Sequence, residues 1–346
     1  MLEVDGSQKS GSGTILRLSV AMAAILNKPL HIFNIRQNRP QPGLRPQHLE
    51  AVLTAAKLCR ASLKGAELDS KEIWLHPTKI VGGKFEAEIG TAGSIPMLLI
   101  TVLPICAFAE RPISLHVSKG GTDVFHSPTI NYLNHVFVPA LRKMGLKISL
   151  TVHKYGYYPK GMGEVSLEVQ PCSRLESLIL DDFGMLESVE GISVCTFLAD
   201  RKVAERQAKA ARDFLKACGY EANIQVVNDF SNPMQKGSSL TLWAKTSTGV
   251  ILGGDAIGEL RKPSEAVGRQ AAENLLREIE AKATVDVHLA DMLIPYMALA
   301  EGNSTFLTRS MTDHLDSNIW LAQKILGVKF EISKAGNLHR VEKKTL

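Results

Sequence analysis

The sequence predicts an α/β protein in which one helix–strand unit recurs and a small second α/β unit is inserted. Apolar stretches with helical spacing alternate with short strands of period two, and Gly or Pro separates them. This rhythm is interrupted once, between residues 182 and 280. With 346 residues, 45% of them hydrophobic, the chain can bury one large core or two.

Four segments carry the repeated unit, and in each an amphipathic or apolar helix leads into an alternating strand. A single unit of this kind cannot bury its apolar face alone, so its neighbours must cover it. The most apolar segment, 95–109, is too short to span a bilayer and contains two prolines, so we expect a buried helix there. The expected helix and strand pairs are 16–29 with 30–36, 97–112 with 113–118, 130–145 with 146–154, and 317–327 with 328–333.

The middle of the chain follows a different order of elements. A strand at 191–200 precedes a charged helix at 202–219, and strands at 221–228 and 239–258 precede a second helix at 264–282. We therefore expect a β-α-β-β-α domain over 182–280, inserted into a larger repeated domain of residues 1–181 and 281–346. One continuous domain is the alternative.

Charge and cysteine content limit the class of protein. The net charge of +5 permits a polyanionic partner without requiring one. The five cysteines include no C-x-x-C pair, which argues against a zinc site and fits a reducing cytoplasm better than a disulfide framework. No signal-peptide pattern or membrane span is found, so we expect a cytoplasmic protein without membrane contact.

The stretch "DGSQKSGSGTILR" (5–17) places small residues ahead of a helix. It fits neither the P-loop template nor the G-x-G-x-x-G dinucleotide fingerprint. Free backbone N–H groups at the helix start could bind an anion, but a plain turn with a Ser or Thr cap explains the same residues.

An arginine-rich loop follows at 34–49 and favours the anion-binding interpretation. It places Arg36, Arg39 and Arg45 among prolines, and Arg17 lies on the preceding helix. Guanidinium groups bind phosphate in a planar, bidentate manner, and prolines reduce the entropy lost when such a loop is ordered. A solvated basic loop is the alternative.

His314 is the strongest nucleophile candidate among the ten histidines. It follows a strand-like stretch and stands at a helix start, between Asp313 and Asp316. A neutral imidazole is a competent nucleophile at pH 7, and a nearby carboxylate could fix its tautomer. A capping or packed histidine is the alternative, and His288 is ambiguous in the same way.

Taken together, these motifs resemble the RNA 3′-terminal phosphate cyclase family nearly from end to end. The resemblance implies three repeats of a two-helix, four-stranded unit with a small α/β domain inserted before the last repeat. The matching segments, in the family's order, are "DGSxxxGxGxILR" (5–17), "IRxNRPxPGLRPQHL" (35–49), "TAGS" (91–94), "GGTD" (120–123), "GYYPKGxGEV" (156–165), "TSTG" (246–249), "HLAD" (288–291) and "HLxSNI" (314–319).

The resemblance also implies a ligase-type, ATP-dependent activity in RNA processing. A histidine takes AMP from ATP, passes it to an RNA 3′-phosphate, and the 2′-OH then displaces AMP to give a 2′,3′-cyclic phosphate. A divalent ion, Mg²⁺ or Mn²⁺, would assist the departure of pyrophosphate, and exposed sheet edges would allow a homodimer. The positions that match family site residues are His314 as nucleophile, His288, Leu289, Ala290, Asp291 and Pro128 as ATP contacts, and Arg17, Arg36, Arg39 and Gln47 as phosphate or RNA contacts.

Several positions depart from the family pattern, among them Tyr155 and Met162 of the hairpin, where the family has Arg and Gly. Ser10 replaces a glutamate associated with metal binding, and Ile100 and Met292 replace glutamines of the nucleotide site. These departures put rate, metal use and nucleotide choice in question. Two alternatives therefore stay open: a non-catalytic, cyclase-like RNA-binding protein, and a relative that adenylylates 5′-phosphate ends.

Overall fold

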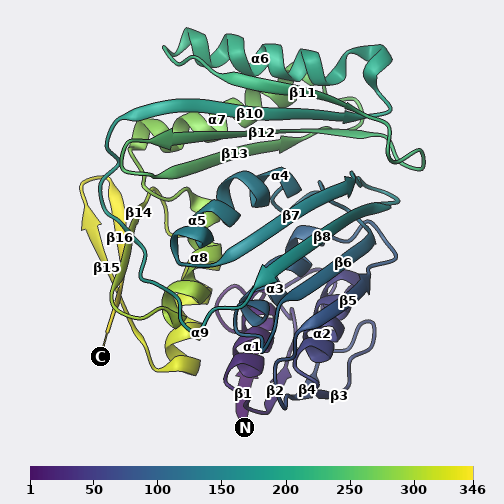
Figure 1. Cartoon of the computed structure of the whole chain (residues 1–346), viewed down its shortest axis with the longest axis vertical. Coiled ribbons are helices and arrows are strands. Elements are labelled where there is room, and N and C mark those ends of the chain that lie inside the picture. The colour runs from purple at the N-terminus through teal and green to yellow at the C-terminus, as the bar shows by residue number, and fades with distance from the viewer. Residues whose placement is uncertain (346) are drawn as a thin grey trace.

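The computed structural model describes residues 1–345 and contains four four-stranded sheets with their helices (Figure 1). Three of the sheets share one topology. In each, the first strand pairs in parallel with the second, and the second continues into an antiparallel hairpin of the last two. Each sheet comes with two helical segments, so the expected three repeats of two helices and four strands are confirmed.

The repeats comprise the following elements. The first has β1 (Leu2–Asp5), α1 (Gly13–Ile25), β2 (Leu30–Phe33), α2 (Pro46–Leu58), β3 (Ser62–Lys64) and β4 (Ile73–His76). The second has β5 (Gly83–Glu88), α3 (Ile95–Ala107), β6 (Ile113–Gly120), the continuous helix α4 (Ile130–Tyr132), η1 (Leu133–Phe137) and α5 (Val138–Lys143), then β7 (Lys147–Lys154) and β8 (Gly163–Gln170). The third has β9 (Ile179–Leu180), α8 (Val287–Leu299), β14 (Ser304–Thr308), α9 (Asp313–Leu326), β15 (Lys329–Ala335) and β16 (Leu338–Lys344).

The fourth sheet belongs to the segment that interrupts the third repeat between β9 and α8. Its strand order, β11-β10-β12-β13, places the first strand in the interior rather than at an edge, unlike the repeats. We propose that residues 182–280 form an inserted domain, at the top of Figure 1, on the larger domain of 1–181 and 281–346. Its elements are β10 (Leu186–Thr196), η2 (Ala199–Arg201), α6 (Val203–Ala217), β11 (Asn223–Asp229), β12 (Gly237–Thr246), β13 (Ile251–Ile257) and α7 (Ser264–Ala281).

The structure corrects one expected strand in this segment. Residues 239–258 are the antiparallel hairpin of β12 and β13 rather than one strand, so the order is β-α-β-β-β-α. The chain reverses at Gly249, whose φ of +78° favours glycine, and the Gly249 N–H donates to the Thr246 carbonyl at 2.8 Å. The turn consists of threonine, serine and glycine, and the alternation of polar and apolar residues continues across it. The sequence pattern therefore did not show where the first strand ends.

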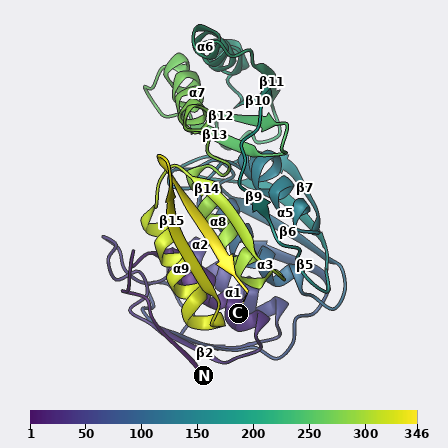
Figure 2. The same cartoon turned by 90° about the vertical axis from the view of Figure 1, so that its left-hand side faces the viewer.

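The helices of the repeats form the interior of the large domain, and the sheets lie outside them (Figure 2). Helix α1 contacts α2, α3 and α9, and α8 contacts α3 and α9. The apolar segment 95–109 is the buried helix α3, as expected. Because α1, α3 and α8 pack together, their N-terminal ends are brought to one place, although they begin at residues 13, 95 and 287.

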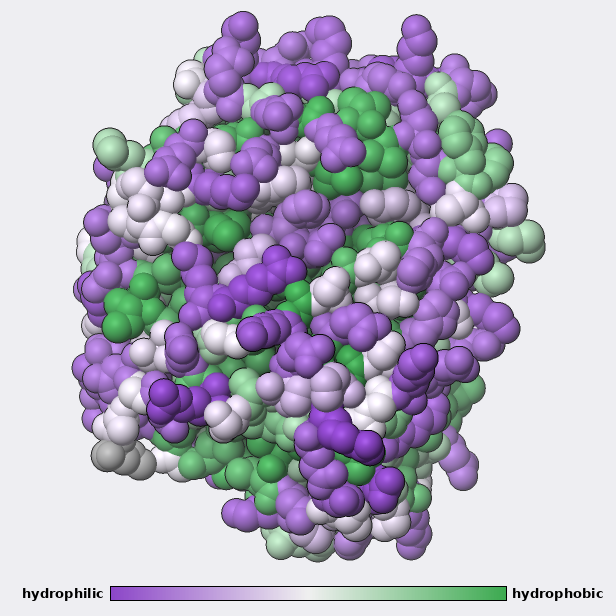
Figure 3. Space-filling model, viewed as in Figure 1, coloured by the Kyte–Doolittle hydropathy of each residue, from purple (hydrophilic) through white to green (hydrophobic). Residues whose placement is uncertain are grey.

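Polar and apolar residues alternate over the face seen in Figure 3. Within residues 1–345, no helix has both the length and the apolar character that crossing a bilayer requires.

Candidate functional site

A cavity of about 690 Å³ lies where the repeats meet. It is lined from the first turns of five helices, contributed by all three repeats. A helix N-terminus carries free N–H groups and a partial positive charge, so five of them favour an anionic ligand. The residues that represent these five helix starts are Gly13 and Thr14 of α1, Gln47 and His48 of α2, Met97 of α3, His288 and Asp291 of α8, and His314 of α9.

The opening loop is held against α9. The Lys9 ammonium pairs with the Asp316 carboxylate at 3.0 Å, and the Ser10 N–H donates to the Ser317 hydroxyl at 3.2 Å. Ser12 caps α1, since its hydroxyl accepts the Thr14 N–H. The sequence left open whether this loop is a capped turn or part of a binding site. In the structure it caps α1 and also forms one wall of the cavity.

His314 lines the cavity on the first turn of α9, which is capped by Thr312. Its Nδ1 lies 3.0 Å from the Thr14 hydroxyl and 3.5 Å from the Ser12 hydroxyl. Burial, followed by the charges of Arg17 and Arg39, lowers the pKa of His314 below its usual value. The imidazole is therefore neutral at pH 7.

The expectation that a neighbouring carboxylate fixes the His314 ring is wrong. Asp313 and Asp316 stand one and two residues away on the helix, and residues at these spacings do not share a face. Asp316 pairs with Lys9 instead, and a hydroxyl from α1 takes the position next to the ring.

Arg17, Arg36 and Arg39 all line the cavity. Nη2 of Arg17 donates to the Thr14 hydroxyl at 3.0 Å, which links the guanidinium to His314 through one oxygen. Burial and the neighbouring arginines lower the pKa of Arg17 to about 10, so it stays charged at pH 7. Arg45 does not join this group, because it pairs with Asp69 at 2.6 Å.

The loop that carries Arg36 is fixed by the arginine itself. Nη1 of Arg36 donates to the carbonyls of Gln41 and Gly43 at 2.8 and 2.7 Å. This leaves the other nitrogens of the guanidinium for a ligand. These two hydrogen bonds fix the Arg36 guanidinium on the cavity wall.

On α8, only the first and the last of the four predicted residues reach the cavity. His288 and Asp291 line it, whereas Leu289 and Ala290 are buried in the core. Residues three apart share a helix face, so a contiguous motif cannot present all its members to one ligand. Burial raises the pKa of Asp291 to about 6, although the Thr312 hydroxyl donates to it.

Gln47 and Pro128 also line the cavity. Oε1 of Gln47 accepts the Ser94 N–H at 2.7 Å, which leaves its amide NH₂ for a ligand. The Ser94 hydroxyl lies 2.6 Å from that of Ser127, the residue before Pro128. The motifs at 35–49 and 91–94 therefore meet where the Gln47 side chain accepts a backbone N–H.

Other lining residues were not predicted. Asp255 and Asn274 come from the inserted segment, and neither belongs to a motif that drew attention. His48 belongs to the motif at 35–49 but had no predicted role. The "TSTG" motif lies outside the cavity, in the turn between β12 and β13, where Thr248 donates to the Asp182 carbonyl.

A comparison with known protein families shows which family this chain belongs to. Residues 8–332 match the family model described as RNA 3′-terminal phosphate cyclase. This chain belongs to the RNA 3′-terminal phosphate cyclase family. Proteins of that name from Pyrobaculum neutrophilum and Methanosarcina mazei are each 42% identical to it, and one from Methanosarcina barkeri is 43% identical. Each alignment covers 99% of this chain, and 97%, 99% and 99% of the respective relative.

Of the departures at Ser10, Ile100 and Met292, the last two line this cavity, and Ser10 lies in the opening loop. Ile100 and Met292 line it beside Pro104 and Pro295, so one part of its wall is apolar. The Ser10 hydroxyl bonds the hydroxyls of Ser12 and Ser317. The loop position of the family's glutamate is therefore filled by a serine cluster without charge.

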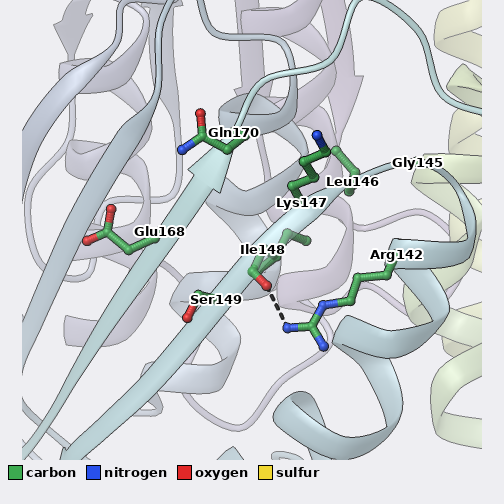
Figure 4. A pocket seen from close by; sticks show the side chains of 8 residues that line it. All are labelled: Arg142, Gly145, Leu146, Lys147, Ile148, Ser149, Glu168 and Gln170. Carbon is green, nitrogen blue, oxygen red and sulfur yellow. Dashed lines mark hydrogen bonds between the residues drawn. The ribbon is translucent and has the colours of Figure 1, made fainter.

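A separate hollow of about 580 Å³ lies beside β7 (Figure 4). Arg142 donates there to the Ile148 carbonyl at 2.7 Å, and Glu168 and Gln170 of β8 lie alongside. None of the site residues expected from the cyclase pattern lines it.

Proposed function

We propose that this protein converts an RNA 3′-terminal phosphate to a 2′,3′-cyclic phosphate at the expense of ATP, with His314 as the adenylylated residue. The observation that carries the proposal is the position of a neutral imidazole among five helix N-termini and three arginines. Such a site attracts phosphate groups and holds a nucleophile against them. Membership of the cyclase family supports the choice of substrates.

In the first step, Nε2 of His314 attacks the α-phosphorus of ATP, and the bond to pyrophosphate breaks. This step needs the lone pair on Nε2, so Nδ1 carries the proton and donates it to the Thr14 hydroxyl. Arg17 donates to the same oxygen and so fixes its direction. Arg36 and Arg39 oppose the charge that develops on the leaving pyrophosphate.

In the second step, an oxygen of the RNA 3′-phosphate attacks the AMP phosphorus, and the P–N bond to His314 breaks. The terminal phosphate gains a good leaving group. The neighbouring 2′-OH then attacks it and displaces AMP, and this step benefits from intramolecular proximity. Arg17, Arg36, Arg39 and Gln47 would hold the RNA phosphate, while His288, Asp291 and Pro128 would contact the nucleotide.

We propose that a divalent ion, Mg²⁺ or Mn²⁺, enters with the triphosphate. Among residues 1–345 there is no cluster of three or more His, Cys, Asp or Glu side chains that could hold a metal by themselves. Mg²⁺ in nucleotide sites relies on phosphate oxygens, water and one or two carboxylates. Asp255 and Asp291 are the carboxylates that line the cavity, and a bound ion would neutralise phosphate charge there.

The experiment that tests the function follows labelled AMP and the RNA end together. With α-labelled ATP and Mg²⁺, the protein should acquire an acid-labile label, which an added 3′-phosphate RNA discharges as the cyclic end appears. RNA with a 5′-phosphate is the comparison substrate. Binding of RNA without any label across Mg²⁺ and Mn²⁺ would instead support a non-catalytic protein.

Adenylylation of His314 should resist moderate acidification. Its pKa lies below the usual value, so the reactive neutral form predominates at pH 7 and is lost only as the pH falls through that lowered pKa. We expect a constant labelling rate from pH 8 to about pH 6.5 and a decline below. Pre-steady-state labelling measures this, and a rate that halves above pH 7 would contradict it.

The Gly13→Ala variant should fold but lose activity. A Cβ at Gly13 would approach Nε2 of His48 to 2.5 Å and Nη1 of Arg17 to 2.9 Å, so both side chains must move. Displacing the guanidinium from Thr14 should cost about 10- to 100-fold in adenylylation rate. Gly327→Ala is the matched control, because no atom lies within 4 Å of a Cβ there, although its positive φ costs some stability.

A further inference from the structure

His48 is a buried histidine on the cavity wall that the steps above leave without a role. It belongs to the first turn of α2, and only 6% of it is exposed. Its Nδ1 is enclosed and has no hydrogen-bond partner among the described residues. Because Nδ1 is enclosed, Nε2 is the ring nitrogen of His48 that a ligand in the cavity can contact.

The other ring nitrogen of His48 lies beside the phosphate-binding residues. Nε2 of His48 and Nη1 of Arg17 would both contact a Cβ at Gly13, so they share the space over the start of α1. On its other side, Arg17 reaches His314 through the Thr14 hydroxyl. Arg17 therefore lies between two imidazoles, and a phosphate bound to it is within reach of both.

We propose that His48 is the general base of the cyclisation step, which accepts the proton of the terminal 2′-OH at Nε2. This inference rests on the proposed function. An RNA 3′-phosphate held by Arg17 carries its 2′-OH on the adjacent carbon of the ribose. The attacking oxygen is therefore near the same guanidinium, on the side opposite the His314 that has delivered AMP.

The step balances without a further reactant. The O2′–P bond forms, and the P–O bond of the anhydride to AMP breaks. AMP leaves with that electron pair as a monophosphate. The proton of the 2′-OH goes to Nε2 of His48, which returns it to water when the products depart.

The charges around His48 suit a base that acts only on bound RNA. Burial, followed by the charges of Arg17 of α1 and of Arg36 and Arg45 in the loop before α2, holds the pKa of His48 well below its usual range. A bound phosphate and AMP place negative charge against Arg17 and Arg36. The field of the guanidinium groups is then offset, and the imidazole becomes more basic when the 2′-OH is present.

The test follows each step in the His48→Gln variant. We expect labelling of His314 by α-labelled ATP within about twofold of the unmodified protein. The RNA-adenylate should accumulate, and its conversion to the cyclic end should slow by about 10²- to 10⁴-fold. RNA with a 2′-deoxy terminus cannot cyclise, so it provides the gel position of the RNA-adenylate that accumulates. His76→Gln, at an exposed strand end, is the matched control and should cyclise normally.

Purified RNA-adenylate, added without ATP, isolates the last step from the first two. His48→Asn is the second variant, and a melting midpoint near that of the unmodified protein establishes the fold for either. Cyclisation within threefold of normal would overturn the proposal, as would labelling and cyclisation that fall in parallel. Failure of the unmodified protein to label at His314 would instead defeat the proposed function, so the two failures are distinguishable.

Discussion

The His314→Ala variant will not acquire covalent AMP and will not cyclise RNA. The imidazole supplies the only protein atom to which AMP is attached in the proposed sequence of steps, and no other cavity histidine has its ring held by Thr14. The expected loss is to background, at least about 10³-fold in the labelling rate. Labelling with α-labelled ATP, followed by acid lability and mapping of the modified peptide, measures it.

The fold should survive this change, because His314 is only partly buried on the first turn of α9 and does not cap it. Its melting midpoint should stay within a few degrees of that of the unmodified protein. The exposed His76→Gln again serves as the control and should label fully. Retention of label in His314→Ala, at another residue, would refute the assignment of the nucleophile.

The Arg17→Met variant will lose adenylylation by about 10²- to 10³-fold. Methionine keeps an apolar side chain of comparable length but removes the charge and the bond from Nη2 to Thr14. The phosphate then loses a cation and His314 loses the fixed direction of its partner. Both kcat and the KM for ATP should therefore worsen, which steady-state kinetics of the cyclase reaction resolve.

Two further arginine variants separate charge from geometry. Arg17→Lys restores the charge without the forked geometry, so it should recover part of the ATP affinity but little of kcat. Arg45→Met removes an arginine of the same region, which is partly exposed and pairs with Asp69, and the variant should stay within about twofold of normal. Equal losses in Arg17→Met and Arg45→Met would show that the effect is one of bulk charge.

Much of the fold could be predicted from the sequence because each helix–strand unit is locally consistent. The helix expected at 317–327 matches α9 up to Leu326, and the strand expected at 113–118 lies within β6. The hairpin at Gly249 was not predicted, because period-two alternation continues through the polar turn. Only the left-handed backbone conformation of Gly249 marks the reversal of the chain.

The sequence predicted those site residues that belong to a continuous motif. It did not predict contacts between residues that are far apart in the sequence. Arg17, Arg36 and His314 carry signals in their own segments, and all three line the cavity. The partner of His314 comes from Thr14, 300 positions earlier, which no local pattern reveals. Asp255 likewise reaches the cavity only through the packing of the inserted segment.

The contact between the opening loop and α9 has a consequence for biosynthesis. The loop carries Lys9 and Ser10, and its partners Asp316 and Ser317 emerge from the ribosome only after the inserted segment has been made. His314, the proposed nucleophile, belongs to the same late segment, and His288 and Asp291 of the cavity also follow the inserted segment. If His314 carries AMP as proposed, a chain released before α9 is made would lack the residue that reacts with ATP.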